Sequence, residues 1–176
     1  MWASRLDRQK GVDQLLAIAR RCPTLTFHVY GEHVLKDSDV DLATGTLEST
    51  YNIIFYGPYA KIEEIRPIEY RAFLYTSLWD GLPNTLIEVG ALGLPIVAPN
   101  VGGIGDLVSA QTGYLVTSPL AVEEFVAAFR QIEADPELAN QRRRTMKEWI
   151  SERHTERAFR NILQRTDGYC EGSADG

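Results

Sequence analysis

The sequence contains few of the residues from which metal sites and disulfide scaffolds are built. It has two cysteines and three histidines among 176 residues. Cys22 and Cys170 are far apart, and no Cys-x-x-Cys motif is present. Neither a disulfide framework nor a zinc site is therefore indicated. Because such cysteine usage is typical of reducing compartments, we expect the protein to be cytoplasmic.

An excess of positive charge and long apolar runs are also missing. The formal net charge is −6 and the calculated pI is about 5.1, so the chain lacks the general basic surface that binds nucleic acid or anionic lipid. No stretch approaches the roughly 20 apolar residues of a transmembrane helix, and no segment has the pattern of a signal peptide. We expect no nucleic-acid partner and no membrane contact by this domain.

The apolar segments that are present alternate with segments of helical spacing. Six short apolar runs predict strands, and helices separate most of them. The result is a single α/β domain with a Rossmann-like, doubly wound parallel six-stranded sheet, for which the usual order is 3-2-1-4-5-6. The predicted strands lie near residues 1–4, 26–30, 53–56, 72–77, 95–98 and 114–116, with final helices at 121–133, 136–150 and 152–164. The domain is expected to span residues 1–166, followed by a small, polar, disordered tail at 167–176.

The most informative stretch is Leu78–Pro99, in which a polar loop leads into an apolar helix and then a strand. Glu88 is the one carboxylate within that helix, and Asn84 shares its face. Burying an unpaired carboxylate costs several kcal/mol, so Glu88 must reach solvent at a cleft or hold a partner. Asp80 lies on the loop before the helix, whose N-terminus is itself an anion site.

The expected strand order brings a second polar loop to the same place. In the order 3-2-1-4-5-6, strands 1 and 4 are neighbours, and ligands bind where the loops after those strands meet. The loop after strand 1 carries Arg5 and Lys10, and the loop after strand 4 leads to Asp80 and Glu88. Two cations and two carboxylates should therefore converge on one cleft.

These residues resemble a known family. Arg5-Leu6-x-x-x-Lys10-Gly11, followed by Asp80-x7-Glu88 within DGLPNTLIEVGALGLPIVAPNVGG, is similar to the donor-binding domain of retaining glycosyltransferases of family four. Those enzymes have the GT-B architecture of two Rossmann domains, and the resemblance covers about residues 2–165. It implies that this chain is the C-terminal half of a GT-B fold, cut within its first strand. The absent N-terminal domain contacts the acceptor in that family.

The resemblance also implies roles for individual residues. Arg5 and Lys10 would hold the diphosphate of a nucleotide sugar, a guanidinium fork beside a point charge. Glu88 would bind the ribose hydroxyls and Asp80 the hydroxyls of the sugar, and these four residues form the implied catalytic set. The implied donor-binding set is Arg5, Lys10, Asp80, Gly81, Leu82, Pro83, Asn84, Thr85, Leu86 and Glu88, with backbone amides of residues 81–86 near the sugar and distal phosphate. The base would lie near Tyr56, Gly57 and Tyr59.

One departure from the family concerns Asp80, because the family commonly has a glutamate at that position. The shorter side chain leaves the identity of the donor sugar open. Asp39-Val40-Asp41 is an Asp-x-Asp sequence, but it lies in a polar insertion away from the predicted site. We therefore expect a metal-independent enzyme without a cofactor.

The function implied is transfer of a hexose from a nucleotide-diphosphate sugar, with retention, to a glycan or lipid-linked acceptor. The pathway class would be polysaccharide biosynthesis, and the isolated domain is expected to have little or no activity without its N-terminal partner domain. Two alternatives remain open. One is a nucleotide-sugar epimerase of the same architecture, and the other is a non-catalytic nucleotide-sugar binding module.

Simpler explanations exist for each motif. Glu88 could pair with a buried arginine, and Asp80 could cap the helix that starts at Asn84. The pair Gly102-Gly103 is a weak phosphate signal and is more typical of a tight turn. The run Arg142-Arg143-Arg144 is typical of the exposed face of a helix.

Overall fold

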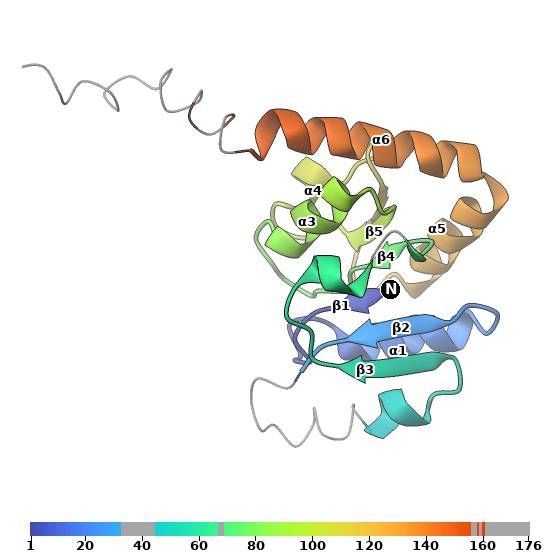
Figure 1. Cartoon of the computed structure of the whole chain (residues 1–176). Coiled ribbons are helices and arrows are strands. Elements are labelled where there is room, and N and C mark those ends of the chain that lie inside the picture. The colour runs from blue at the N-terminus through green and yellow to red at the C-terminus, as the bar shows by residue number, and fades with distance from the viewer. Residues whose placement is uncertain (33–44, 67–68, 156–157, 159, 161–176) are drawn as a thin grey trace, which may run out of the picture.

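The computed structural model of the chain describes residues 1–32, 45–66, 69–155, 158 and 160. Strands and helices alternate through most of this part, as the sequence predicts (Figure 1). The strands are β1 (Trp2–Ala3), β2 (Phe27–Tyr30), β3 (Ile53–Gly57), β4 (Phe73–Leu74), β5 (Ile96–Pro99) and β6 (Tyr114–Val116). The helices are α1 (Val12–Arg21), α3 (Asn84–Leu92), α4 (Ile104–Leu107), α5 (Val122–Ala134), α6 (Pro136–Arg153) and the short 3₁₀ helix η1 (Ile62–Ile65). Residues 45–49 are also helical.

All of the strand pairs are parallel, which confirms the predicted α/β architecture. The hydrogen bonds, however, assign the strands to two three-stranded sheets, β1-β2-β3 and β4-β5-β6, where one six-stranded sheet was expected. The reason is the length of the two central strands, since β1 and β4 contain two residues each. Met1 links the sheets there: its amino nitrogen donates to Ala72 O at 2.9 Å, and Leu74 N donates to its carbonyl at 2.9 Å.

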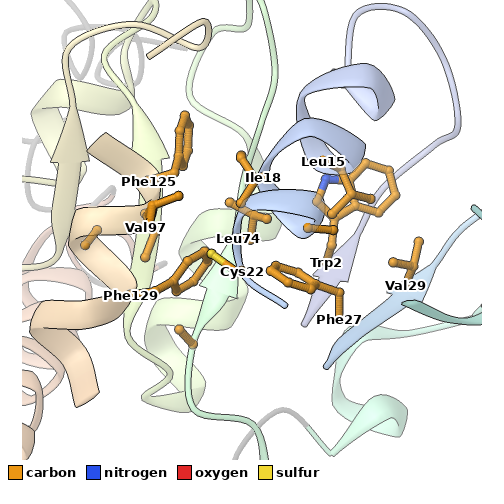
Figure 2. Packing of buried hydrophobic residues seen from close by; sticks show 14 of the residues in the cluster. Trp2, Leu15, Ile18, Cys22, Phe27, Val29, Leu74, Val97, Phe125 and Phe129 are labelled. Carbon is orange, nitrogen blue, oxygen red and sulfur yellow. The ribbon is translucent and has the colours of Figure 1, made fainter. Parts of the chain in front are cut away.

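One face of the sheets is covered by α1 and α5 (Figure 2). Trp2 and Leu74 project from the strands toward Leu15 and Ile18 of α1, and Phe125 of α5 lies on the same side. These side chains are almost inaccessible to solvent. Burying a large apolar side chain contributes about 1.5–3 kcal/mol, so this face supplies much of the driving force for folding.

The opposite face is covered by α3, α4 and α6, and α6 lies across α3 (Figure 1). Alternation along the strands sends Ala3 and Phe73 to this face while their neighbours in the chain face α1. Gly90 allows the close contact between the two helices, because a Cβ there would lie 2.7 Å from Cδ1 of Ile150 and 2.9 Å from Cγ of Met146. The helix that carries Glu88 is thereby held firmly against the core.

Helix α6 differs from its prediction in its basic run. Arg142 places its guanidinium 4.3 Å from the ring centre of Tyr114 and donates to Gly113 O at 3.1 Å. Arg143 is half-buried, and Arg144 alone of the three is exposed. The prediction of an exposed basic face was therefore wrong for Arg142 and Arg143. Arg142 lies three residues after Ala139 and four before Met146, so it shares the face of α6 that carries these buried residues.

Several expectations fall on other parts of the chain. Helix α6 continues to Arg153, three residues past its expected end, and the tail at 167–176 lies outside the described residues, as does most of the predicted helix at 152–164. Within the described ranges, no helix is long and apolar enough to cross a membrane.

Candidate functional site

The loops that follow β1 and β4 lie side by side, as expected for a site at the switch point between the two halves of the sheet. Leu78 N donates to Gln9 O at 2.8 Å, and Gln9 Nε2 donates to Trp79 O at 3.0 Å. Thr76 Oγ1 donates to Lys10 O at 2.7 Å and accepts from Trp2 Nε1 at 2.9 Å. The two loops are thus held together by direct hydrogen bonds, most of which are accepted by backbone carbonyls.

Gly11 makes this close approach possible. Its φ of +70° lies in the left-handed region, and a Cβ on it would lie 2.2 Å from Thr76 O. Residues other than glycine rarely adopt that backbone conformation, and none of their side chains would fit against the carbonyl. The Lys10-Gly11 pair singled out in the sequence is therefore a cation followed by the residue that lets its loop reach β4.

Three side chains form a hydrogen-bonded cluster at the junction. Lys10 Nζ lies 2.5 Å from Asp80 Oδ2 and 3.1 Å from the hydroxyl of Tyr75. The Tyr75 hydroxyl in turn donates to Asp80 Oδ2. The Lys10 and Asp80 side chains keep 12% and 17% of their exposure, so the pair is only partly open to solvent. Lys10 and Asp80 are brought together as predicted, but in this ligand-free state each is the partner of the other.

The pKa values reflect this arrangement. Partial burial by itself would raise the pKa of Asp80, but the hydrogen bonds from Lys10, Tyr75 and the Gly81 amide, with the Lys10 charge, lower it below 3.8. Burial and the hydrogen bond to Asp80 raise the pKa of Tyr75 well above its ordinary range. Near neutral pH Asp80 is therefore a carboxylate and Tyr75 a neutral phenol.

The N-terminus of α3 opens beside the cluster. Pro83 is its N-cap and no side chain caps the helix. Asp80 Oδ1 accepts from the Gly81 amide at 3.0 Å, so the interpretation of Asp80 as a helix cap was wrong. Within the described part of the chain, the amides of Asn84 and Thr85 have no acceptor. They are the unpaired donors of a helix start, which suit an oxyanion.

Leu86 differs from the other predicted donor-binding residues. Its amide donates to Pro83 O at 3.0 Å, and its side chain is fully buried in the core. Leu82, Pro83 and Thr85 are half-buried, whereas Gly81 and Asn84 are exposed. Leu86 therefore lies on the buried face of α3 and not at the junction of the two loops.

The glycine loop before α4 packs against the backbone of the loop that carries Asp80. Gly103 N donates to Gly81 O at 3.2 Å. Gly102 has a φ of +52°, and a Cβ there would lie 1.8 Å from Asp80 O. The pair is thus a tight turn that packs on the Asp80-Gly81 backbone, in agreement with the interpretation from sequence.

Glu88 is exposed on α3, one turn beyond Asn84. Within the described residues it has no ion pair, so the structure shows no buried arginine as its partner. Burial raises the pKa of the Tyr59 hydroxyl, and the negative charge of Glu88 raises it further. The charge of Glu88 thus acts on the hydroxyl of Tyr59, one of the predicted base residues.

Arg5 is placed less tightly than Lys10. Its side chain is 51% exposed, and Nη2 lies 3.3 Å from both Asp7 Oδ2 and Gln9 Oε1. Because Gln9 also binds Trp79 O, the guanidinium lies on the same loop network as Lys10. The structure gives no direct contact between Arg5 and the Lys10–Asp80 pair.

The predicted base residues are divided between two surroundings. Tyr56 stacks on Tyr30 with ring centres 4.6 Å apart, and its hydroxyl lies 3.0 Å from His28 Nδ1. Tyr59 meets Tyr30 edge-on at 6.5 Å. Gly57 ends β3 with a φ of +78° and open space where a Cβ would be. Tyr59 thus contacts Tyr30 edge-on, and Tyr56 belongs to an aromatic stack on β2 and β3.

Tyr75 is the residue that the sequence analysis missed. It lies in the run predicted as strand 4, and its ring is buried. A signal was available, because a buried tyrosine hydroxyl requires a hydrogen-bond partner and Asp80 follows within the same loop.

Among the described residues, no group of three or more His, Cys, Asp and Glu side chains could hold a metal ion. Metal independence stays a prediction.

Comparison with known proteins decides the family. The model of the family described as "Glycosyl transferases group 1" matches residues 2–149, most of the chain. The chain belongs to this glycosyltransferase family. The glycogen synthase of Mycobacterium tuberculosis is 28% identical over 160 residues, covering 86% of this chain and 37% of that protein.

Solved structures extend the likeness of this glycosyltransferase domain to its fold. HepE of Anabaena, solved with UDP, gives a TM-score of 0.79 at 21% identity over 94% of this chain and 48% of that one. The C-terminal domain of LpcC, a group 1 glycosyl transferase from Francisella tularensis, gives 0.71 at 18% identity over 88% and 85%. The chain thus spans about half of HepE, and it has the Rossmann-like fold of the C-terminal half of GT-B enzymes.

Proposed function

We propose that this domain binds a nucleotide-diphosphate sugar between the loops after β1 and β4, as the donor half of a retaining hexosyltransferase. The observation that carries the proposal is the junction itself. A lysine–aspartate pair joins the two loops. Among the described residues, the amides of Asn84 and Thr85 at the start of α3 are unpaired, and exposed Glu88 lies one turn further along that helix. Phosphate suits the lysine and the helix N-terminus, whereas hydroxyl groups suit the carboxylates.

The chemistry of this half would be binding and charge stabilisation. A leaving nucleoside diphosphate gains negative charge as the glycosidic bond breaks, and Lys10, Arg5 and the start of α3 would stabilise that charge. Asp80 would orient the sugar and Glu88 the ribose. HepE, with the same fold, was solved with UDP and glucose, which supports a sugar nucleotide as the ligand class.

The acceptor would be a glycan or a lipid-linked glycan, and it would be held by an N-terminal domain. A relative named glycogen synthase, of which this chain matches 37%, supports polysaccharide synthesis as the pathway class. Neither the epimerase nor the non-catalytic binding module is favoured, because the matching family is one of glycosyl transferases. The cytoplasmic location stays a prediction from cysteine content.

The test of this function is Glu88→Gln. A hydrogen bond to a charged group contributes about 1.5–3 kcal/mol, so loss of the ribose contact should weaken nucleotide binding roughly ten- to a hundred-fold. Because Glu88 is exposed and unpaired in the described structure, the free energy of unfolding should stay within about 0.5 kcal/mol of wild type. Calorimetric titration with UDP-, GDP- and ADP-glucose, and a thermal melt, measure the two effects.

Two variants serve as controls. Glu148→Gln removes another exposed carboxylate from α6 and should leave binding unchanged. Arg5→Ala should weaken the binding of a nucleoside diphosphate but hardly affect the binding of the free nucleoside. Glu88→Gln should weaken the binding of both. A Glu88→Gln protein that unfolds easily yet binds normally when folded would exclude the ribose role.

A further inference from the structure

We propose that Tyr75 is a positioning residue of the donor site, which orients Asp80 and Lys10 toward the sugar and the distal phosphate through its hydroxyl. This inference rests on the function proposed above and adds a residue to it. Tyr75 follows β4 directly, and its ring is held between the strands and the helices of the α3 face. A side chain packed in this way presents its hydroxyl at a fixed point.

The hydrogen-bonding capacities of the three side chains define what remains for a ligand. An ammonium has three N–H donors, and Lys10 uses one on Asp80 Oδ2 and one on Tyr75. A carboxylate has about four acceptor sites, and Asp80 uses two on Oδ2 and one on Oδ1. Within the part of the chain that the structure describes, one donor of Lys10 and one acceptor of Asp80 are left.

These two remaining positions match a sugar phosphate. The free Lys10 donor suits a phosphate oxygen, and the free site on Asp80 Oδ1 suits a sugar hydroxyl. Without the Tyr75 hydroxyl, Asp80 Oδ2 would lose a donor and Lys10 an acceptor. The ammonium of Lys10 would then be held by Asp80 alone and free to rotate about that bond, and the geometry of both remaining positions would be lost.

The short side chain at position 80 makes this support necessary. An aspartate reaches one methylene less far than a glutamate, and here it lies between Lys10 and Tyr75. Tyr75 therefore fixes how far the carboxylate extends toward the sugar. Which hydroxyl of the donor is recognised would depend on this pair of residues together.

The experiment is a double-mutant cycle of Tyr75→Phe and Asp80→Asn in the full chain. Tyr75→Phe keeps the ring and should weaken the binding of UDP-glucose about ten-fold. The binding of UDP should weaken less, because UDP lacks the sugar. In the Asp80→Asn background the further loss from Tyr75→Phe should fall to about two-fold or less, since partners in one network are not additive. If UDP is not the nucleotide that wild type prefers, the GDP or ADP pair replaces it.

A second readout needs no ligand. Tyr75→Phe should raise the pKa of the Asp80 carboxyl, measured by NMR of its carboxyl carbon, because one of its stabilising hydrogen bonds is removed. Tyr70→Phe is the matched control: it deletes a hydroxyl that is bonded to Tyr30 at 2.6 Å and should change neither the Asp80 pKa nor the affinity.

The outcomes separate the two proposals. Two results would overturn the positioning role even if nucleotides bind. One is an Asp80 pKa that is unchanged in Tyr75→Phe. The other is a loss of UDP-glucose affinity on Tyr75→Phe that is equally large with aspartate and with asparagine at position 80. A wild-type chain that binds none of the three nucleotide sugars would overturn the donor function, and with it the positioning role for a donor. The Asp80 pKa would then show only whether the Tyr75 hydrogen bond exists.

Discussion

At the scale of single residues, the site is defined by which charges are already paired. Lys10 and Asp80 compensate each other across 2.5 Å, and Arg5 lies 3.3 Å from Asp7. Glu88 carries an exposed negative charge without an ion pair in the described part of the chain. A donor diphosphate would therefore compete for cations that are partly occupied, while the ribose would find a free carboxylate.

The paired state of Asp80 predicts a pH dependence of stability. Its pKa is lower in the folded protein than its ordinary 3.8, so its contribution is present above that value and is lost as the pH falls through the folded pKa. Asp80→Asn should destabilise the chain by about 1–2 kcal/mol near pH 6, because a charge-assisted hydrogen bond is weakened and the pair is partly solvated. Urea denaturation of both proteins from pH 7 to pH 2 measures this. The difference should shrink below about pH 4, and a constant difference would show that the carboxylate charge contributes nothing.

At the scale of elements, close backbone contacts position the site. Gly11 brings the β1 loop against Thr76, and Gly102 brings the loop before α4 against Asp80. Helix α3 is fixed from behind by α6, whose Arg142 also binds the start of β6. The polar loop of the site thus lies between two contacts that only glycine allows.

Gly102→Ala tests this element-scale support. The added Cβ would lie 1.8 Å from Asp80 O, at a φ of +52° that alanine tolerates poorly. Strain of this kind costs about 1–3 kcal/mol, and the shifted Asp80 should also weaken nucleotide-sugar binding. Gly45→Ala is the matched control, because its Cβ would meet nothing within 4 Å. Thermal melts should show a loss for Gly102→Ala alone, and equal melting temperatures for the two variants would contradict the role of the contact.

At the scale of the whole molecule, two apolar layers share the same strands. One lies between the sheets and α1 with α5 (Figure 2), and the other lies under α3, α4 and α6 (Figure 1). The site is at the edge where the loops after β1 and β4 meet, so it depends on both layers. The chain spans 48% of HepE and 37% of the M. tuberculosis glycogen synthase.

We therefore expect residues 1–176 alone to bind donor but to show little or no transfer. The physical reason is that acceptor binding and the groups around the reacting carbon would come from the other domain. A radiolabelled-sugar transfer assay with the isolated chain, beside the protein that includes an N-terminal domain, measures this. Robust transfer by the isolated chain would show that the acceptor domain is dispensable.

The alternation of strands and helices, and the loops that carry the site, could be predicted from the sequence alone. Apolar runs and helical spacing are local properties, so β2, β3, β5 and β6 lie close to where they were predicted. The convergence of Lys10 with Asp80 also followed from sequence, because parallel strands have only a few allowed orders. The pairing of those charges with each other did not follow.

Which groups are paired and which are free depends instead on how the elements pack in three dimensions. The Tyr75 hydroxyl, the Gly102 contact with Asp80 O and the Arg142 stack on Tyr114 join residues from different segments of the chain. The division into two sheets likewise depends on contacts between distant segments, because β1 and β4 are not paired as strands and Met1, just before β1, bonds to the segment of β4. A periodic pattern shows which face of an element is buried. Hydrogen bonds and ion pairs form between atoms a few ångströms apart, and that separation is set only when the elements pack.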